Sequence, residues 1–195
     1  MTALEGTTGR EEGELEGYPA LLGHVLSGRE FGPLVRSSDR PKHQADWRAL
    51  VRDLARLPPS SEQLAERFHT QWHVCHHFLR ELVDDDALII DMLWVWLPRY
   101  QGPDMVLYRG KNIDRFEAGR IGTAWSDKQE TAEMFAGGLN AVGKGGVVLR
   151  ATVPATAIIA GPSKHSLYLG ESEFTIDIRK VTEFETVCTF PPSPC

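Results

Sequence analysis

The hydrophobic pattern of this chain changes its period near residue 100, and the change divides the sequence into two kinds of structure. Before Pro98, apolar residues recur three and four positions apart, which is the spacing of amphipathic helices. After Pro103 they fall in short β-rich runs separated by glycine, proline and serine, which is typical of strands. The sequence therefore predicts an α+β fold in which a helical half precedes a strand-rich half.

The helical half is expected to hold four helices and one long loop. The predicted helices are residues 18–26, 44–57, 61–83 and 87–97, and the predicted loop is 28–42. Ser60 or Ser61 would cap the third helix, and the acidic run 84–86 offers an N-cap for the fourth. The fourth helix, ALIIDMLWVWL, is apolar on almost every side, which predicts burial between the other helices and a sheet.

The strand-rich half is expected to contain six strands and one helix. The predicted strands are residues 105–109, 146–153, 157–160, 166–169, 174–178 and 181–190, and the predicted helix is 127–136, capped by Ser126 or Asp127. Arg150 and Asp177 are expected in an ion pair or at a solvated strand edge, worth at most about 1 kcal/mol.

The length of the chain sets its domain organisation. A chain of 195 residues is the size of one ordinary domain, so residues 18–100 and 101–190 are expected to fold together. Residues 1–17 have little to bury and are predicted to be a disordered tail, and 191–195 a short irregular tail.

The charge of the chain limits the kinds of partner it can have. Its formal net charge is −6, which disfavours a nucleic-acid binder that works by broad neutralisation of phosphates. The residues after Tyr100 carry 11 acidic and 10 basic side chains, so a local basic groove in that half stays open.

The cysteines and the N-terminal segment favour a reducing compartment. Three cysteines without a short spacing argue against a disulfide framework. The N-terminal segment is acidic and has no apolar signal-peptide core, and there is no run of about 18 apolar residues to span a membrane. We therefore expect a cytoplasmic protein without membrane partners, or one delivered into a target cell without a conventional signal peptide.

The stretch Gly170-Glu171-Ser172-Glu173 contains the most unusual charge pattern in the strand-rich half. On a strand, Glu171 and Glu173 would share one face, while Phe174 and Ile176 would turn into the core. Placing two carboxylates together costs electrostatic energy, which points to proton transfer or to the binding of a developing cation. The alternative is a strand edge with two solvated glutamates.

Two further strand ends carry polar groups that could join the glutamates in one site. The first is Leu107-Tyr108-Arg109-Gly110, in which the arginine fork can bind a phosphate and the glycine lets a ligand approach the backbone. The second is Gly122-Thr123-Ala124-Trp125-Ser126, which places Ser126 at a corner between a strand and a helix.

Taken in this order, the three segments resemble the motifs of the NAD-dependent mono-ADP-ribosyltransferase superfamily, in the Arg-Ser-Glu branch with a Glu-X-Glu ending. The resemblance covers residues 107–181, and the middle motif departs from the usual Ser-Thr-Ser because Ala124 and Trp125 precede a single serine, Ser126. It implies a core of two small packed β-sheets that binds NAD, here preceded by a helical layer.

The resemblance also implies a role for each motif residue in the cleavage of NAD. Breaking the bond between nicotinamide and ribose develops positive charge on the sugar, as in glycoside hydrolysis. Glu173 would stabilise that charge, and Ser126 would orient Glu173 and contact the same ribose. Arg109 would bind the pyrophosphate, and the backbone of Gly110 would bind the nicotinamide amide.

Two aromatic residues are candidates for stacking on nicotinamide, which is a planar cation in NAD. Trp125 lies in the middle motif and Phe135 follows Ala132 at helical spacing. The alternative for both is an ordinary position in the core, and for Phe135 the helical spacing favours the core.

The acceptor side of the reaction is implied by Glu171 and by the loop at residues 161–170 before it. In enzymes of this type, a glutamate two residues before the catalytic one goes with arginine as the acceptor, because it can hold the guanidinium and remove its proton. Tyr168 would contact the acceptor protein; the alternative is that it packs with Leu167 and Leu169.

The segment HTQWHVCHH places His69, His73, His76 and His77 within little more than two helical turns. Zinc binding is geometrically possible, but no HEXXH motif is present and further ligands would have to come from elsewhere. A solvated or partner-facing histidine patch is favoured, and no metal is expected.

The sequence therefore predicts a glycosyltransferase, a mono-ADP-ribosyltransferase that uses NAD as a co-substrate and modifies a macromolecule. Arginine of a protein is favoured over nucleic acid as the acceptor. By analogy such a protein is a toxin or an effector, with an antitoxin or regulatory protein as a further partner. The alternatives are an NAD glycohydrolase, for which water is the acceptor, and a non-catalytic binding or immunity module with the same fold.

Overall fold

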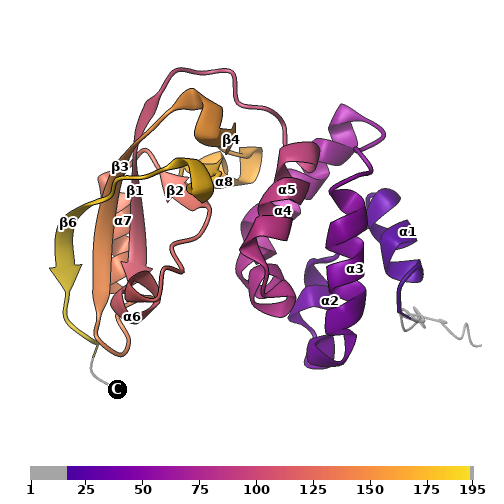
Figure 1. Ribbon diagram of the computed structural model, residues 1–195, viewed down its shortest axis with the longest axis horizontal. Helices are drawn as coiled ribbons and strands as arrows, with labels where there is room; N and C mark the ends of the chain where they lie inside the picture. The colour runs from indigo at the N-terminus through magenta and orange to yellow at the C-terminus, as the bar shows by residue number, and fades with distance from the viewer. Residues whose placement is uncertain (1–16, 194–195) are drawn as a thin grey trace, which may run out of the picture.

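A computed structural model describes residues 17–193, so the predicted disordered tail lies outside the described residues apart from Gly17. A layer of helices stands on one side of the molecule and a sheet on the other, with strand β4 and helix α8 nearest the helices (Figure 1). The mixed helical and antiparallel composition confirms the predicted α+β class. No helix among residues 17–193 is long and apolar enough to cross a membrane.

The helical layer contains five α-helices and a short 3-10 turn. These are α1 (Ala20–Leu26), α2 (Gly32–Arg36), the 3-10 turn η1 (Arg40–His43), α3 (Gln44–Leu54), α4 (Glu62–Val83) and α5 (Asp86–Trp96). Ser61 and Asp85 cap α4 and α5 by accepting hydrogen bonds from backbone amides, as predicted. The predicted loop 28–42 is wrong in part, because Pro33 and Pro41 lie in the first turns of α2 and η1, where proline favours helix.

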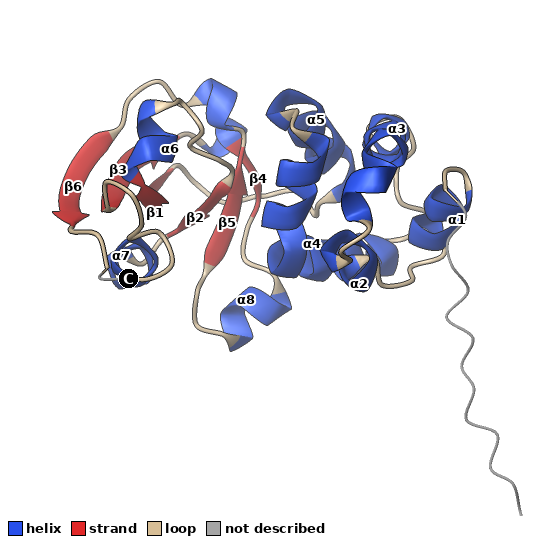
Figure 2. Cartoon of the chain, turned by 90° about the horizontal axis from the view of Figure 1, so that it is seen from below, coloured by secondary structure: helices blue, strands red, loops and turns tan. Residues whose placement is uncertain are grey.

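Helix α5 is buried between the other helices and the sheet, as its all-round apolar sequence predicts (Figure 2). Trp96 is buried and donates to the carbonyl oxygens of Leu54 and Leu57. The helical core continues into the sheet through Ile159 and Ala160 of β4. The core of the helical half therefore reaches into the sheet, whose own core around Leu107, Trp125 and Leu149 forms a separate cluster.

The strands form one antiparallel sheet. They are β1 (Met105–Asn112), β2 (Ala124–Ser126), β3 (Gly146–Val153), β4 (Ile158–Ala160), β5 (Glu173–Ile176) and β6 (Glu185–Phe190), in the spatial order β4-β5-β2-β1-β3-β6. The prediction of two packed sheets is wrong, because β2 pairs with both β1 and β5 and joins the strands into one surface. Three α-helices and two 3-10 turns connect them: α6 (Ile113–Glu117), α7 (Gln129–Gly137), α8 (Lys164–Tyr168), η2 (Ala155–Ala157) and η3 (Ile178–Lys180).

Helix α8 replaces the strand predicted at residues 166–169. Ser163 accepts a hydrogen bond from the amide of Ser166 at 3.0 Å, and this N-cap starts a helix where the apolar run suggested a strand. Helix α7 was predicted to be capped by Ser126 or Asp127, but it begins after Lys128, and the Ser126 hydroxyl accepts from the Lys128 amide instead.

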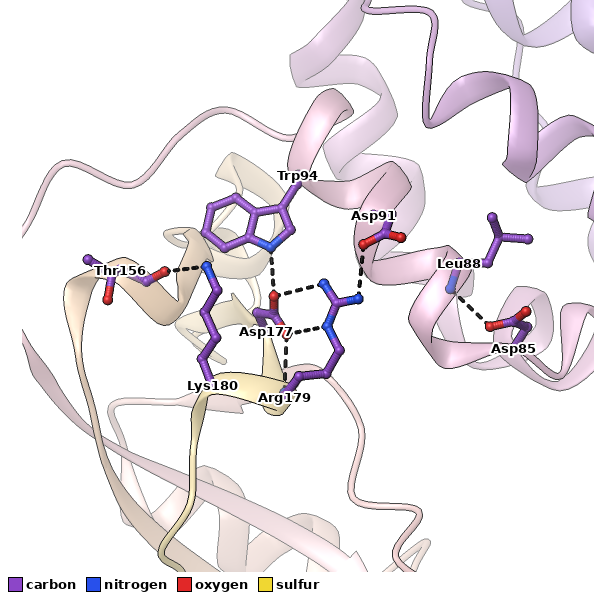
Figure 3. Close-up of polar contacts among 8 residues, drawn as sticks. All are labelled: Asp85, Leu88, Asp91, Trp94, Thr156, Asp177, Arg179 and Lys180. Atoms are coloured by element: carbon purple, nitrogen blue, oxygen red, sulfur yellow. Dashed lines mark hydrogen bonds and ion pairs between the residues drawn. The ribbon is translucent and has the colours of Figure 1, made fainter.

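Asp177 joins the sheet to α5 (Figure 3). The predicted ion pair is present, with Arg179, but Asp177 is buried and does not lie at a solvated strand edge. Its carboxylate is fully buried and accepts from Trp94 Nε1 at 2.8 Å. Arg179 donates to both carboxylate oxygens at 2.9 Å and also to Asp91 at 2.9 Å. Burial raises the pKa of Asp177, but the hydrogen bonds from Arg179 and Trp94 outweigh it and hold the pKa below its ordinary value.

Replacing Asp177 by alanine should lower the free energy of unfolding by on the order of 3 kcal/mol, because Trp94 Nε1 loses its buried partner. The folded-state pKa of Asp177 is depressed, so its stabilisation is present above the unfolded pKa of about 3.9 and is lost as the pH falls through the folded pKa. Urea unfolding between pH 3 and 7 measures both effects.

Asp91→Ala is the matched control, because its side chain is 58% exposed and binds the same arginine. It should cost less than about 1 kcal/mol. An equal loss in the free energy of unfolding for Asp177→Ala and Asp91→Ala would show that the buried contacts of Asp177 do not hold the helices to the sheet.

Candidate active site

The sheet order brings the three sequence motifs onto neighbouring strands. Ser126 of β2 pairs with Tyr108 of β1 on one side and with Glu173 of β5 on the other. Arg109 follows Tyr108 directly, so the arginine, serine and glutamate motifs lie side by side although they are far apart in the sequence. The proximity that the sequence motifs require is therefore present in the fold.

The two glutamates reach one place from different backbone conformations. Glu173 is the first residue of β5, whereas Glu171 lies in the loop before it, so the prediction of a shared strand face is wrong. Between them Ser172 has a φ of 49°, in the left-handed region, which interrupts the extended backbone. Phe174 and Ile176 are buried, as predicted.

The carboxylates meet the histidine face of α4. Glu171 Oε2 lies 3.1 Å from His73 Nε2, and Glu173 Oε1 lies 3.4 Å from His73 Nδ1. His76 Nε2 lies 4.0 Å from Glu173 Oε2. The sequence had suggested His73 and His76 only as part of a patch, although their place beside the apolar stripe of α4 was a signal that they face inward.

The backbone that carries the glutamates is fixed by hydrogen bonds from three side chains. Ser126 Oγ donates to the carbonyl of Glu171 at 2.7 Å, and Lys128 Nζ donates to the carbonyl of Gly170 at 2.9 Å. The amide of Glu173 donates to the buried Ser166 Oγ at 2.6 Å. Ser126 thus acts on the backbone at Glu171, whereas the sequence predicted that it orients the Glu173 side chain; Ser166 was not predicted at all.

Arg109 is half-buried and has hydrogen-bonding capacity left. One terminal nitrogen donates to the carbonyl of Ala124, whereas Nε is buried and has no partner. Burial and the nearby charge of Arg80 lower the pKa of Arg109 to about 9, although Glu173 acts in the opposite direction. An orphaned guanidinium nitrogen beside a second arginine is a group that an anion would satisfy.

A third cation extends this positive region. Lys111 is buried on β1, and burial together with the charges of Arg109 and Arg80 lowers its pKa to about 6. Arg80 binds Asp86 through two hydrogen bonds of 2.8 and 2.6 Å, which offsets only part of the positive charge. Arg80 and Lys111 line a pocket of about 260 Å³ together with two further arginines and four acidic residues, whereas Arg109 is not among its lining residues. We call Arg80, Arg109 and Lys111 the cation cluster.

The structure separates the two aromatic candidates. Trp125 is buried in the core, stacks on Phe184 with ring centroids 5.9 Å apart, and donates to the carbonyl of Gly122, so its predicted contact with nicotinamide is wrong. Phe135 is half-buried and lies against Gly110: a Cβ on Gly110 would be 3.0 Å from the Cβ of Phe135. Phe135 therefore remains the aromatic candidate beside the motif.

Gly110 permits close packing as well as ligand approach. A Cβ at this position would lie 2.1 Å from the backbone oxygen of Ala132 in α7, which cannot yield. The glycine is therefore required for α7 to lie on β1, whether or not its backbone also contacts a ligand.

The loop and helix at residues 161–170, predicted to meet the acceptor, expose apolar side chains. Tyr168 of α8 is 85% exposed, and its neighbours Leu167 and Leu169 are also exposed, so the alternative of packing with these leucines in the core does not hold. The Tyr168 ring stacks on the ring of His165 at a centroid distance of 6.5 Å. This surface is open to a large molecule.

His73, Glu171 and Glu173 also form a group whose ligand atoms lie within 4.8 Å of one another among the described residues. Their closest contacts, however, use opposite nitrogens of the His73 ring, whereas a metal ion binds a single nitrogen of an imidazole. In this arrangement the ring lies between the two carboxylates.

Comparisons with known proteins found no counterpart for this chain: no family model matches its sequence, and no curated protein or solved structure matches it.

Lys111→Met should raise the free energy of unfolding at pH 7 by at least about 1 kcal/mol, because the lysine is charged when unfolded and largely neutral when folded. In the wild type this cost is full below pH 6 and fades as the pH rises from about 6 towards 10, so the difference between the two proteins should shrink over that range. Urea unfolding at several pH values measures the slope.

Lys144→Met is the matched control, because Lys144 is 59% exposed and pairs with Glu117. It should leave the slope between pH 6 and 9 unchanged. A Lys111→Met protein that is less stable than the wild type at pH 7 would contradict the claim that burial of Lys111 lowers the free energy of unfolding.

Proposed function

We propose that the chain is a mono-ADP-ribosyltransferase whose core has a single sheet in place of two packed sheets, and that it transfers ADP-ribose from NAD to an arginine of a protein and releases nicotinamide. One observation carries the proposal: Arg109, Ser126 and Glu173 come from neighbouring strands, with Ser126 paired to Glu173 and to the residue before Arg109. This is the arrangement that the sequence motifs require. The class of reaction follows from the chemistry of these groups.

Cleavage of NAD begins at the bond between the ribose C1′ and the nicotinamide nitrogen. The electron pair of that bond leaves with nicotinamide, which departs neutral, and the ribose acquires oxocarbenium character. The backbone amide of Glu173 donates to the Ser166 hydroxyl at the start of β5, and the Glu173 carboxylate stabilises this charge. Phe135, beside Gly110, stacks on the nicotinamide ring before it leaves.

The cation cluster is suited to the pyrophosphate of NAD. Arg109 Nε is buried without a partner, and Arg80 adds positive charge that Asp86 offsets only in part, whereas Lys111 is largely neutral at pH 7 and would take up a proton beside a bound anion. A bound pyrophosphate would supply an acceptor for Arg109 and relieve the mutual repulsion of the cations. The residues present therefore fit a dianionic group, and Arg109 would hold it from β1.

Glu171 serves the acceptor. Its carboxylate binds the guanidinium of the target arginine, and a guanidinium nitrogen forms the new bond to C1′ while its proton passes to Glu171 and then to water. Tyr168 and the exposed leucines beside it contact the acceptor protein. An apolar surface next to the site favours a protein over nucleic acid as the acceptor, and a toxin or effector with an antitoxin or regulatory partner is the proposed context.

A second candidate is an NAD glycohydrolase, in which water replaces the arginine. The observation that favours it is the contact between Glu171 and His73, which leaves less room for a guanidinium beside the Glu171 carboxylate. A non-catalytic binding module is less well supported, because such a module gains nothing from a buried arginine nitrogen without a hydrogen-bond partner.

The deciding experiment measures nicotinamide release and label transfer to an arginine-rich protein for the wild type, Glu173→Gln and Glu171→Gln. Glu173→Gln should lose both activities by at least about a hundredfold, because the charge that stabilises the oxocarbenium is gone. Glu171→Gln should lose transfer by a similar factor and keep some nicotinamide release.

Glu183→Gln, at an exposed position between η3 and β6, is the control and should behave as the wild type. A wild type that releases nicotinamide but modifies no protein would favour the glycohydrolase. Near-normal activity of Glu173→Gln would remove this residue from the site.

A further inference from the structure

His73 occupies an unusual position between two carboxylates. Its side chain is only 5% exposed, in the middle of α4, and its two ring nitrogens contact different glutamates: Nε2 lies 3.1 Å from Glu171 and Nδ1 lies 3.4 Å from Glu173. A neutral imidazole carries a proton on one nitrogen only, and an ionised carboxylate can only accept. Both contacts are attractive together only if the ring is protonated on both nitrogens.

The surroundings leave His73 as the histidine that carries this charge. His69 and His76 flank it on α4; burial is the main cause that lowers the pKa of His69 to about 4 and that of His76 well below its ordinary value, so both are neutral. His165 of α8 packs edge-on against His73 at a centroid distance of 5.7 Å.

The pKa of His73 itself moves in the opposite direction. Burial alone would lower it, but the contacts with Glu173 and Glu171 outweigh burial and raise the pKa above its ordinary value. Nδ1 is buried and makes no hydrogen bond, so its contact with Glu173 at 3.4 Å is an ion-pair contact.

We propose that His73 is a positioning residue of the transferase site, whose protonated ring binds Glu171 and Glu173 at once and holds them in their two separate roles. The inference rests on the proposed function for its kinetic consequences, but not for the protonation itself. Without the positive ring, two neighbouring carboxylates would repel, and one of them would take up a proton. His73 therefore keeps Glu173 ionised for the ribose and Glu171 ionised for the proton of the acceptor arginine.

The inference gives the helical half of the chain a part in the chemistry. Transfer needs both carboxylates, whereas release of nicotinamide needs mainly Glu173. Loss of His73 should therefore harm transfer more than hydrolysis. As the pH rises through the pKa of His73, the ring loses one proton and one of its two contacts, so transfer should decline on the alkaline side.

The first test reads the protonation of His73 directly, by nitrogen-15 NMR of the histidine rings in the full-length protein. At pH 7 both nitrogens of His73 should be protonated. In Glu171→Gln and in Glu173→Gln its pKa should fall, because each variant removes one charge that favours the imidazolium. A single proton on the His73 ring at pH 6 to 7, or an unchanged pKa in both variants, would overturn the proposal.

The second test is kinetic and compares His73→Ala, His73→Gln and His24→Gln, with folding checked by thermal unfolding. His73→Ala should lower kcat for transfer about 10- to 100-fold with a small change in KM for NAD, and should lose the alkaline decline. His73→Gln should recover part of the rate, since its amide can donate to one carboxylate, and should also lack the decline. His24, on α1 far along the helical layer, is the control and should leave rates and pH profile unchanged.

The outcomes separate this inference from the proposed function. Failure of the wild type to release nicotinamide would end the proposed function, whereas the NMR result would still decide the charge on His73. Normal transfer with a normal pH profile in folded His73→Ala would overturn the positioning role. Stoichiometric Zn²⁺ binding that requires His73, Glu171 and Glu173 would replace it with a metal site.

Discussion

The contact between α4 and the start of β5 places the candidate site at the junction of the two halves of the chain. Helix α4 supplies His73 and Arg80, whereas β5 and the loop before it supply the two glutamates. The helical core that continues into β4 and the buried Asp177 network beneath α5 hold the layers in this relation. Charged groups from both halves meet at this junction: His73 of α4 lies between the two glutamates, and Arg80 of α4 lies near Arg109 of β1.

The sequence could predict the part of the site that depends on strand order and local motif. Ser126 ends β2 and Glu173 begins β5, as the spacing of glycines and β-rich residues indicated, whereas Arg109 lies inside β1, which continues to Asn112. The contribution of α4 could not be derived in the same way. Periodicity identifies which face of a helix is buried, but it does not identify the segment that lies against that face. The contact between His73 and Glu171 could therefore not be predicted. The role of Trp125 failed for a related reason, because a motif position does not fix the side of the sheet on which its ring lies.

The errors in the predicted fold have local causes. Ser163 caps α8, where an apolar run suggested a strand. Pro33 lies in the first turn of α2, where loop-forming residues suggested a loop. Asp177 looked like a surface residue because its partners, Trp94 and Arg179, come from α5 and from the turn after β5. The long helices were predicted well because their caps, Ser61 and Asp85, and their periodicity agree with each other. The single sheet depends on the three-residue strand β2, which pairs with both β1 and β5. A strand this short has no sequence pattern from which the two pairings could be predicted.

The measurement that bears most directly on these conclusions is mass spectrometry of an arginine-rich protein incubated with NAD and the purified chain. If the site formed by Arg109, Glu171 and Glu173 works as proposed, the protein gains ADP-ribose on arginine, and free nicotinamide appears in equal amount. An unmodified protein, with NAD left intact across a broad set of acceptors, would contradict the assignment of this site to ADP-ribosyl transfer.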